Sequence, residues 1–249
     1  MKRSAMVLAI VAVLGGGAPN AHAGSFNCFG EAPTIVGTPG DDILIGTDGP
    51  DVIVGLGGSD FIFGGDGPDL ICGGRGDDGE FIPSRGVGGL FGGLGVDKIS
   101  GGPGNDEVNG GRDSLLDSDS GSGDFLYGKG GDDHICDNAC AQNSYQMTDS
   151  GDDRIWGGAG NDILSSTGGN DHQLGGRGND RLGRQLFVCD ATSCEEVVTV
   201  DTGADTYLGG AGDDTITASD GTEGNDVVNG GDDIDNCMAD ARDTIFKCE

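Results

Sequence analysis

A nine-residue period governs residues 37–72, which read as the units GTPGDDILI, GTDGPDVIV, GLGGSDFIF and GGDGPDLIC. Glycine stands at the first and fourth positions of each unit, Asp at the sixth and an apolar residue at the eighth. Glycine at this density opposes an α-helix, because each one costs about 1 kcal/mol relative to alanine. No segment beyond the N-terminal apolar run shows a helical period of 3.6 residues. The repeat therefore favours turns that alternate with short extended pieces.

The same period runs through most of the remaining chain. It continues as GGRGDDGEF, GGLGVDKIS and GGPGNDEVN, passes through a degenerate GGRDSLLDS at residues 110–118, and returns as DSGSGDFLY and GKGGDDHIC. Two longer interruptions, residues 137–147 and 184–199, separate the later units. We expect the degenerate unit to fill the place of a normal one, so that the register of the repeat is kept.

Each unit reads as a six-residue turn followed by a strand of about three residues. The eighth residue should face inward and its two neighbours outward, because side chains alternate along a strand. So short a strand must stack on others, which predicts a solenoid of parallel strands around a thin column of Leu, Ile and Val. Two units would form one coil, and the predicted fold class is all-β.

The residue types of the turn point to a hard cation. Glycine permits positive φ and close backbone approach, and a turn leaves carbonyl groups without ladder partners. In a stack, these carbonyls and the Asp side chains of neighbouring coils would form an all-oxygen cage. Calcium accepts six to eight oxygens in irregular geometry, whereas magnesium demands a tighter octahedron. Calcium is therefore the predicted ion.

The composition of the chain is a second reason to expect a bound cation. The chain has 43 acidic and 13 basic residues, a net charge of −30, and 53 glycines. Like charges repel one another on compaction and glycine loses much entropy on ordering, so both features oppose folding. This charge excludes nucleic acid and anionic membranes as natural partners. Acidity alone would also fit a solvated, disordered linker, but a linker needs no fixed spacing of its acids.

The repeated Gly-Gly-x-Gly-x-Asp-x-apolar-x pattern resembles the RTX, or haemolysin-type, calcium-binding nonapeptide repeat. The strongest units begin at residues 37, 46, 55, 64, 92, 101, 157, 175, 209 and 221. The resemblance implies a parallel β-roll, an RTX-type β-solenoid with short loop excursions, that binds several calcium ions. It places metal ligands at the sixth positions, which are Asp42, Asp51, Asp60, Asp69, Asp78, Asp97, Asp106, Asp124, Asp133, Asp153, Asp162, Asp171, Asp180, Asp205, Asp214, Asp226 and Asp235.

The resemblance also implies which aspartates share an ion, because alternate units of such a roll lie on the same edge. The implied pairs are Asp42 with Asp60, Asp51 with Asp69, Asp60 with Asp78, Asp106 with Asp124, Asp153 with Asp171 and Asp162 with Asp180. The same spacing puts Leu115 opposite Asp97 and Gln142 opposite Asp133. Sites at Asp97 and Asp133 are therefore doubtful.

The chain divides into segments around this repeat. Lys2 and Arg3, the apolar run that follows and Ala21-His22-Ala23 indicate a signal peptide, residues 1–23, because a run of about ten residues is too short for a membrane anchor. We expect a secreted protein with no membrane insertion. The remaining segments are an N-terminal cap 24–36, repeat blocks 37–136, 148–183 and 200–238, Cys-bearing loops 137–147 and 184–199, and a C-terminal cap 239–249.

Eight cysteines in an exported chain predict disulfides. Proximity suggests Cys136–Cys140, Cys189–Cys194 and Cys237–Cys248, which leaves Cys28 for Cys72. A zinc site is the alternative, but His134 and His172 lack ligand-like spacing to the cysteines. The signal peptide, the cysteines and the terminal Cys248-Glu249 resemble secreted calcium-binding repeat proteins of actinobacteria.

Three functions are to be distinguished for such a chain. The sequence favours a secreted calcium-binding protein that folds when the ion binds. The alternative is an extracellular adhesion or scaffold protein that uses the loop excursions to contact a surface polymer or another protein. Catalysis is not expected, because the chain has neither Gly-x-Ser-x-Gly nor His-Glu-x-x-His and residues 24–36 cannot form a further domain.

The spacing makes a prediction about Asp41 and Asp42, which have the same charge at the fifth and sixth positions of one unit. Asp42→Ala should weaken calcium binding at that edge much more than Asp41→Ala, because only the sixth position is a ligand. Calcium titration of both variants measures the difference. Equal losses would show that bulk charge, rather than spacing, is responsible.

Overall fold

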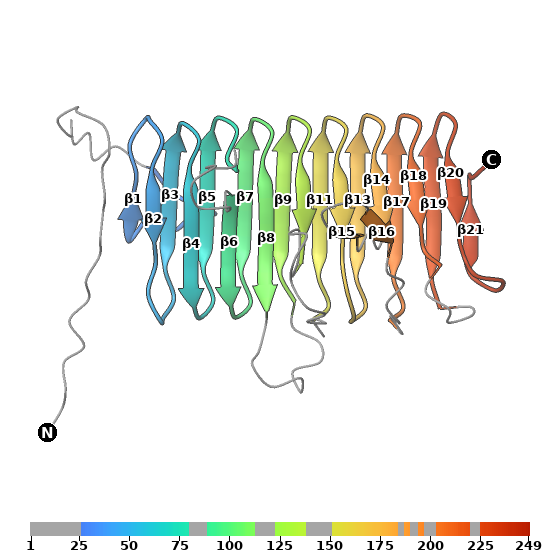
Figure 1. Cartoon of the computed structure of the whole chain (residues 1–249), viewed down its shortest axis with the longest axis horizontal. Coiled ribbons are helices and arrows are strands. Elements are labelled where there is room, and N and C mark those ends of the chain that lie inside the picture. The colour runs from blue at the N-terminus through green and yellow to red at the C-terminus, as the bar shows by residue number, and fades with distance from the viewer. Residues whose placement is uncertain are drawn as a thin grey trace, which may run out of the picture.

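Two stacked parallel sheets form the body of the protein (Figure 1). The structure is a computed structural model that describes residues 26–79, 89–112, 123–137, 151–183, 187–189, 194–196, 203–219 and 225–249. These residues contain strands and turns but no helix, and hence no helix that could span a membrane. The chain passes back and forth between the two sheets, so the predicted all-β parallel roll is confirmed.

The first sheet has ten strands. They are, in spatial order, β1 (Ile35–Val36), β3 (Val52–Gly57), β5 (Leu70–Arg75), β7 (Lys98–Pro103), β9 (Phe125–Gly130), β11 (Arg154–Ala159), β13 (His172–Arg177), β17 (Thr206–Ala211), β19 (Val227–Asp232) and β21 (Thr244–Phe246).

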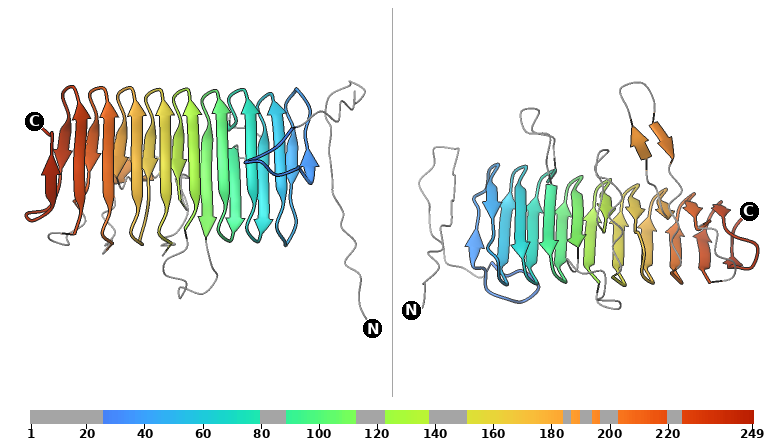
Figure 2. Two further views of the ribbon diagram at one scale, coloured as in Figure 1. Left: turned by 180° about the vertical axis from the view of Figure 1, so that it is seen from behind. Right: turned by 60° about the horizontal axis from the view of Figure 1, so that its bottom comes forward.

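The second sheet has nine strands. They are β2 (Ile43–Ile45), β4 (Phe61–Asp66), β6 (Gly89–Leu94), β8 (Glu107–Arg112), β10 (His134–Cys136), β12 (Ile163–Ser165), β14 (Arg181–Gly183), β18 (Thr215–Thr217) and β20 (Asn236–Met238). Strands β15 (Phe187–Cys189) and β16 (Cys194–Glu196) form a separate antiparallel pair outside the two sheets (Figure 2).

The strand register confirms two units per coil. Ile53 in β3 lies opposite Ile71 in β5, eighteen residues later, and Leu44 in β2 lies opposite Ile62 in β4. The expected strand length was wrong in much of the roll. Many strands have six residues, because the ladder continues through the first three residues of the next unit, as in Val52–Gly57.

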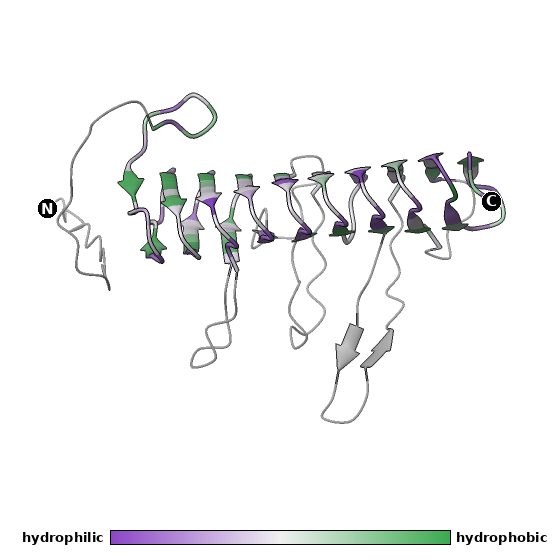
Figure 3. Ribbon diagram, turned by 90° about the horizontal axis from the view of Figure 1, so that it is seen from above, coloured by the Kyte–Doolittle hydropathy of each residue, from purple (hydrophilic) through white to green (hydrophobic). Residues whose placement is uncertain are grey.

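The core is one column of side chains between the sheets. Eighth-position residues such as Leu44, Ile71 and Ile99 are at most 1% exposed, whereas the ninth-position Ile45 is 47% exposed. The predicted inward direction of the eighth position is therefore confirmed. Figure 3 looks along the strands and shows how narrow the space between the two rows of strands is. Such a core is thin, because each coil contributes only two side chains to it.

Two polar side chains interrupt the aliphatic column next to each other. Gln173 is fully buried, and its Nε2 donates to Ser166 Oγ (2.8 Å) while its Oε1 accepts from the Gly183 N–H (2.9 Å). Tyr207 lies opposite Gln173 in the sheet and donates its hydroxyl to Asp205 Oδ2 (3.0 Å). Both polar groups have partners, as buried polar groups require.

The turns lie on two edges of the roll. We call edge A the row of turns that lead from the ten-stranded sheet to the nine-stranded sheet, and edge B the row that leads back. Every described edge A turn has the six residues of the repeat, from Gly37–Asp42 to Gly230–Asp235. Insertions nevertheless occur on both edges. The chain leaves the regular path on edge A after Gly79, between β5 and β6, and on edge B after Arg112, Asp137, Gly183 and Ser219.

The expectation for GGRDSLLDS was wrong. Among the described strands, β7 pairs directly with β9 and β8 pairs directly with β10, with no strand from the degenerate unit between them. The degenerate unit therefore does not supply half a coil. A turn can take extra residues at a small entropic cost, which rises only slowly with loop length.

Disulfides fix both ends of the described roll. Cys28–Cys72 joins the N-terminal segment to β5, and Cys237–Cys248 joins β20 to the C-terminal segment. Both predicted pairs are confirmed. Cys189 and Cys194 are register partners across β15 and β16, a backbone arrangement that suits their predicted bond. Cys140, the predicted partner of Cys136, and the signal peptide 1–23 lie outside the described residues.

An aromatic stack lies on the outer face of the ten-stranded sheet. The rings of Tyr127 and Trp156, neighbours in register, are parallel with centroids 4.6 Å apart. The Lys98 ammonium lies 4.3 Å from the Phe29 ring centroid, and the Lys129 ammonium lies 4.5 Å from that of Tyr127. These contacts bind the N-terminal segment to the sheet and stabilise the middle of the roll.

The two glycines of the turn 46–51 provide a matched test of the fold. A Cβ on Gly46 would lie 2.9 Å from Asp51 Oδ2 and 3.0 Å from the Gly64 carbonyl carbon, whereas a Cβ on Gly49 would meet no atom within 4 Å. Gly46→Ala should therefore lower stability by about 1–3 kcal/mol. Gly49→Ala should change it by no more than about 0.5 kcal/mol. Urea unfolding in calcium measures both, and equal midpoints would contradict the predicted close approach.

Candidate metal centre

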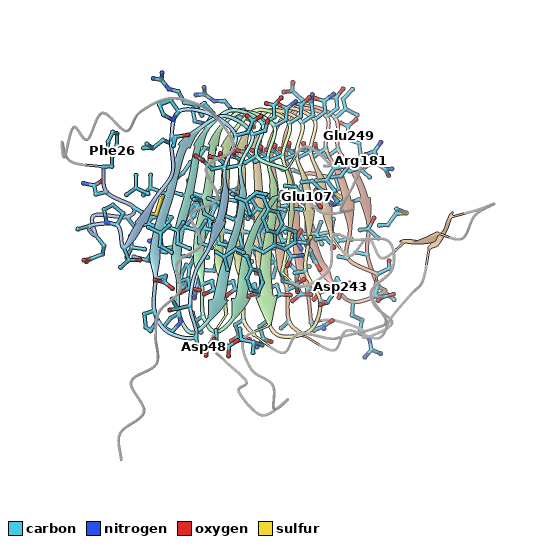
Figure 4. All side chains as sticks on the ribbon, turned by 60° about the vertical axis from the view of Figure 1, so that its left-hand side comes forward. Phe26, Asp48, Glu107, Arg181, Asp243 and Glu249 are labelled. Carbon is cyan, nitrogen blue, oxygen red and sulfur yellow. A yellow bond between two sulfur atoms is a disulfide. The ribbon has the colours of Figure 1, made fainter. Side chains whose placement is uncertain are left out.

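The sixth-position aspartates form two buried columns, one along each edge. None of these side chains is more than 6% exposed. The edge A column contains Asp42, Asp60, Asp78, Asp106, Asp133, Asp162, Asp180, Asp214 and Asp235. The edge B column contains Asp51, Asp69, Asp97, Asp124, Asp153, Asp171, Asp205 and Asp226. In Figure 4, Asp48 and Asp243 mark the two ends of edge B.

Hydrogen bonds join the carboxylates within each column. The backbone N–H of Asp42 donates to Asp60 Oδ1 (2.9 Å), and the N–H of Asp60 donates to Asp78 Oδ1 (2.9 Å). The ladder continues across insertions, since the Asp69 N–H donates to Asp97 Oδ1 (2.8 Å), 28 residues later. Each Asp is thus held by the coil before it, whatever the length of chain between the two.

This ladder shows that one predicted pair was wrong and that the two positions considered doubtful have aspartate neighbours. Asp106 neighbours Asp78 and Asp133, not Asp124, which lies on the other edge. The neighbour of Asp97 is Asp124 rather than Leu115, and that of Asp133 is Asp162 rather than Gln142. The errors share one cause, because fixed spacing ignores residues that turns take up without adding a strand. The predicted neighbours Asp42–Asp60, Asp51–Asp69, Asp60–Asp78, Asp153–Asp171 and Asp162–Asp180 do adjoin.

The second carboxylate oxygen has no hydrogen-bond partner at many of these positions. In the described part of the chain, this holds for the buried Oδ2 atoms of Asp60, Asp69, Asp78, Asp106, Asp133, Asp162, Asp171, Asp180, Asp214 and Asp235. A buried unpaired carboxylate oxygen is costly, and each such group needs an explanation. A row of such atoms is what a set of cations would satisfy.

A backbone carbonyl converges on the same place. A Cβ on Gly37, at the first position, would lie 2.6 Å from both Asp42 Oδ2 and the Gly55 carbonyl oxygen of the next coil. The first glycines of other turns, such as Gly64 and Gly175, have the corresponding two neighbours. Carboxylate and carbonyl oxygens are the ligands that calcium prefers. The residues present therefore fit calcium.

Burial raises the pKa of these carboxyl groups. Desolvation, opposed by the backbone hydrogen bond and reinforced by neighbouring carboxylates, raises the pKa of Asp60 from 3.8 to about 7. The same causes raise the pKa of Asp133 to about 8 and that of Asp180 to about 7. The charged columns are therefore unfavourable unless a cation balances them.

Sequence reasoning missed a second ladder, at the fifth position on edge A. The Ser59 N–H donates to Asp41 Oδ1 (2.9 Å), and the Asn161 N–H donates to Asp132 Oδ1 (2.8 Å). These bonds run in the direction opposite to the sixth-position ladder. Frequent Asp and Asn at the fifth position is the signal that could have revealed it. Since Asp41→Ala removes such a bond, stability and calcium affinity must be measured separately in that variant.

The two-sheet roll with carboxylate columns along its turns defines a class of protein, the calcium-binding β-rolls. The family model described as RTX calcium-binding nonapeptide repeat (4 copies) matches residues 36–71, 45–79, 90–114, 147–182 and 199–237, more than half of the chain. The chain belongs to this RTX repeat family, whose repeat binds calcium. Searches of curated proteins and of solved structures gave no match.

The raised pKa values predict how the calcium-free chain responds to pH. The folded-state pKa values of Asp106, Asp69 and Asp133 are about 6, 7 and 8, above the ordinary value of 3.8. Their contribution to stability is therefore fully present below about pH 3.8 and is lost as pH rises through 6–8. Circular dichroism of the calcium-depleted protein should show more β-structure at pH 5 than at pH 8. A signal that falls on acidification would contradict this.

Proposed function

We propose that the protein is a secreted calcium-binding protein in which calcium is a folding cofactor. One observation carries the proposal: buried, unpartnered Oδ2 atoms recur along the two columns while the core between them is thin. Calcium supplies the positive charge that balances these carboxylates when bound. Because the turns take this arrangement only in the folded chain, binding energy becomes folding energy.

The proposed ligands are the seventeen sixth-position aspartates named above, with first-position carbonyls of the following coil. Edge A is the stronger series, because all its described turns keep six residues. On edge B, the described regular turns are 46–51, 64–69, 92–97 and 166–171. We expect calcium ions to bind at these turns in the same way as we propose for the edge A turns.

Disulfides support secretion. Cys28–Cys72 and Cys237–Cys248 are bonds of a kind that persists in oxidising compartments. The predicted signal peptide points the same way. No enzymatic activity is proposed, since the repeat of this family is a structural calcium-binding unit.

A scaffold that presents insertions is the second candidate. The observation in its favour is that most places where the described chain leaves the regular path lie on edge B, after Arg112, Asp137, Gly183 and Ser219, whereas on edge A the chain does so after Gly79. Insertions that lie mainly on one edge would let the roll contact an extracellular polymer or protein while most edge A turns stay unchanged. The two functions are compatible, because the scaffold needs the calcium-stabilised roll.

Calcium removal tests the primary proposal. In chelator at pH 7.5, the chain should lose most of its β-structure, and millimolar calcium should restore it, because unbalanced carboxylates repel one another. Circular dichroism and calorimetric titration follow both steps, with magnesium as the control ion. A β-rich spectrum that is unchanged between chelator and calcium would refute folding on binding, and a calorimetric titration without heat would refute calcium binding.

A further inference from the structure

Asp137 breaks the repeat on edge B. It follows β10 directly and takes the first position of its turn, where Gly46, Gly64, Gly92 and Gly110 stand in earlier coils. A side chain at that position in those coils would overlap the sixth-position carboxylate, as a Cβ on Gly110 would overlap Asp124 Oδ2. Asp137 is nevertheless only 1% exposed. An additional carboxylate therefore lies at a turn where the regular repeat has only the sixth-position carboxylate.

Three carboxylates meet at this turn. One oxygen each from Asp137, Asp153 and Asp171 lies within 4.8 Å of the other two, and all three side chains are buried. Asp153 and Asp171 are successive members of the edge B column, joined by the bond from the Asp153 N–H to Asp171 Oδ1 (3.0 Å). Asp137 thus adds a ligand atom that the nonapeptide pattern does not contain.

Asp171 is the independent sign that the cluster binds a ligand. Its side chain is 2% exposed, its Oδ1 accepts from Asp153, and its Oδ2 has no hydrogen-bond partner. Burial raises the pKa of this carboxyl, and the neighbouring charges of Asp153, Asp137 and Asp205 raise it further. A buried carboxylate oxygen beside other carboxylates is stable only with a cation or a proton.

The turn of the next coil holds Asp137 in place. Thr167, at the second position of the turn 166–171, donates both its backbone N–H and its hydroxyl (3.1 Å) to Asp137 Oδ2. In that turn, Ser166 and Thr167 replace the usual pair of glycines, and Ser166 in turn accepts from the buried Gln173. The departures from the repeat at this turn therefore form one connected group around the carboxylates.

We propose that Asp137, Asp153 and Asp171 together bind one calcium ion, at a three-carboxylate site that differs from the repeat sites in using a first-position side chain. All donors are oxygens, which favours a hard cation over zinc or copper. The choice of calcium rests on the proposed function, whereas the site rests on this cluster alone. A third negative ligand should make this site bind calcium more tightly than a two-carboxylate site.

The position of the site gives it a structural role. Asp137 precedes residues 138–150 and Asp153 follows them, so one ion would join the two ends of this insertion. Closing a loop at its base removes the freedom of its ends. The ion would thereby hold the regular coils on either side in register where the nonapeptide turn is missing.

Two substitutions of Asp137 test the proposal in the full chain. Asp137→Gly restores the residue that other coils have at this position, and Asp137→Asn keeps an oxygen that can accept from Thr167. The control is Asp48→Asn, which removes one charge from an exposed side chain in another edge B turn. Native mass spectrometry in increasing calcium counts the ions bound to each protein, and circular dichroism in calcium reports the fold.

At the lowest calcium concentrations, both Asp137 variants should bind one ion fewer than wild type and the Asp48 variant, because the two remaining carboxylates bind that ion more weakly. Equal ion counts for all four proteins at every calcium concentration would overturn this site while leaving the proposed function intact. A wild-type chain that binds no calcium would overturn the proposed function itself. If Asp137→Gly fails to fold in calcium, the ion count of Asp137→Asn decides.

Discussion

The hydrogen bond from one sixth-position Asp N–H to the Oδ1 of the next coil's Asp sets the geometry of the roll. It brings carboxylates such as Asp42, Asp60 and Asp78 into one buried column, where their charges repel. The same bond uses only one oxygen of each side chain and leaves the other directed at the turn. The feature that aligns the coils therefore also creates the demand for a cation, which is why folding and calcium binding should be one process.

The two edges differ in how many insertions the chain makes, but the sixth-position ladder continues on both. Edge A keeps the six-residue turn throughout the described roll, and its sixth-position column continues from Asp78 to Asp106 across the insertion after Gly79. Edge B accepts insertions, yet the Asp ladder crosses them, as between Asp124 and Asp153 (2.6 Å). The sixth-position ladder thus keeps the coils aligned on both edges while the length of chain between them varies. The Asp137 cluster shows how a lost turn can be replaced by a different set of ligands.

Prediction from sequence succeeded where a residue's role depends on its place within one unit. Inward Leu44 and Ile71, the close approach at Gly46 and the burial of the sixth-position Asp all follow from a nine-residue rule. It failed where a role depends on a residue's neighbours in other coils. Gln173 occupies an apolar position because Ser166 and Gly183 satisfy its amide, and Asp137 replaces a glycine because Thr167 binds it.

The sequence by itself determined the repeating coil: glycine where backbones meet, Asp at the turn, and one apolar residue facing inward. These are local requirements of φ, size and alternation, which nine residues are enough to express. Only the tertiary structure decided which coils adjoin, and therefore that Asp106 neighbours Asp133 and that Asp97 neighbours Asp124. Register is set by hydrogen bonds between strands, and the entropy of closing a turn depends so weakly on its length that spacing alone does not reveal it.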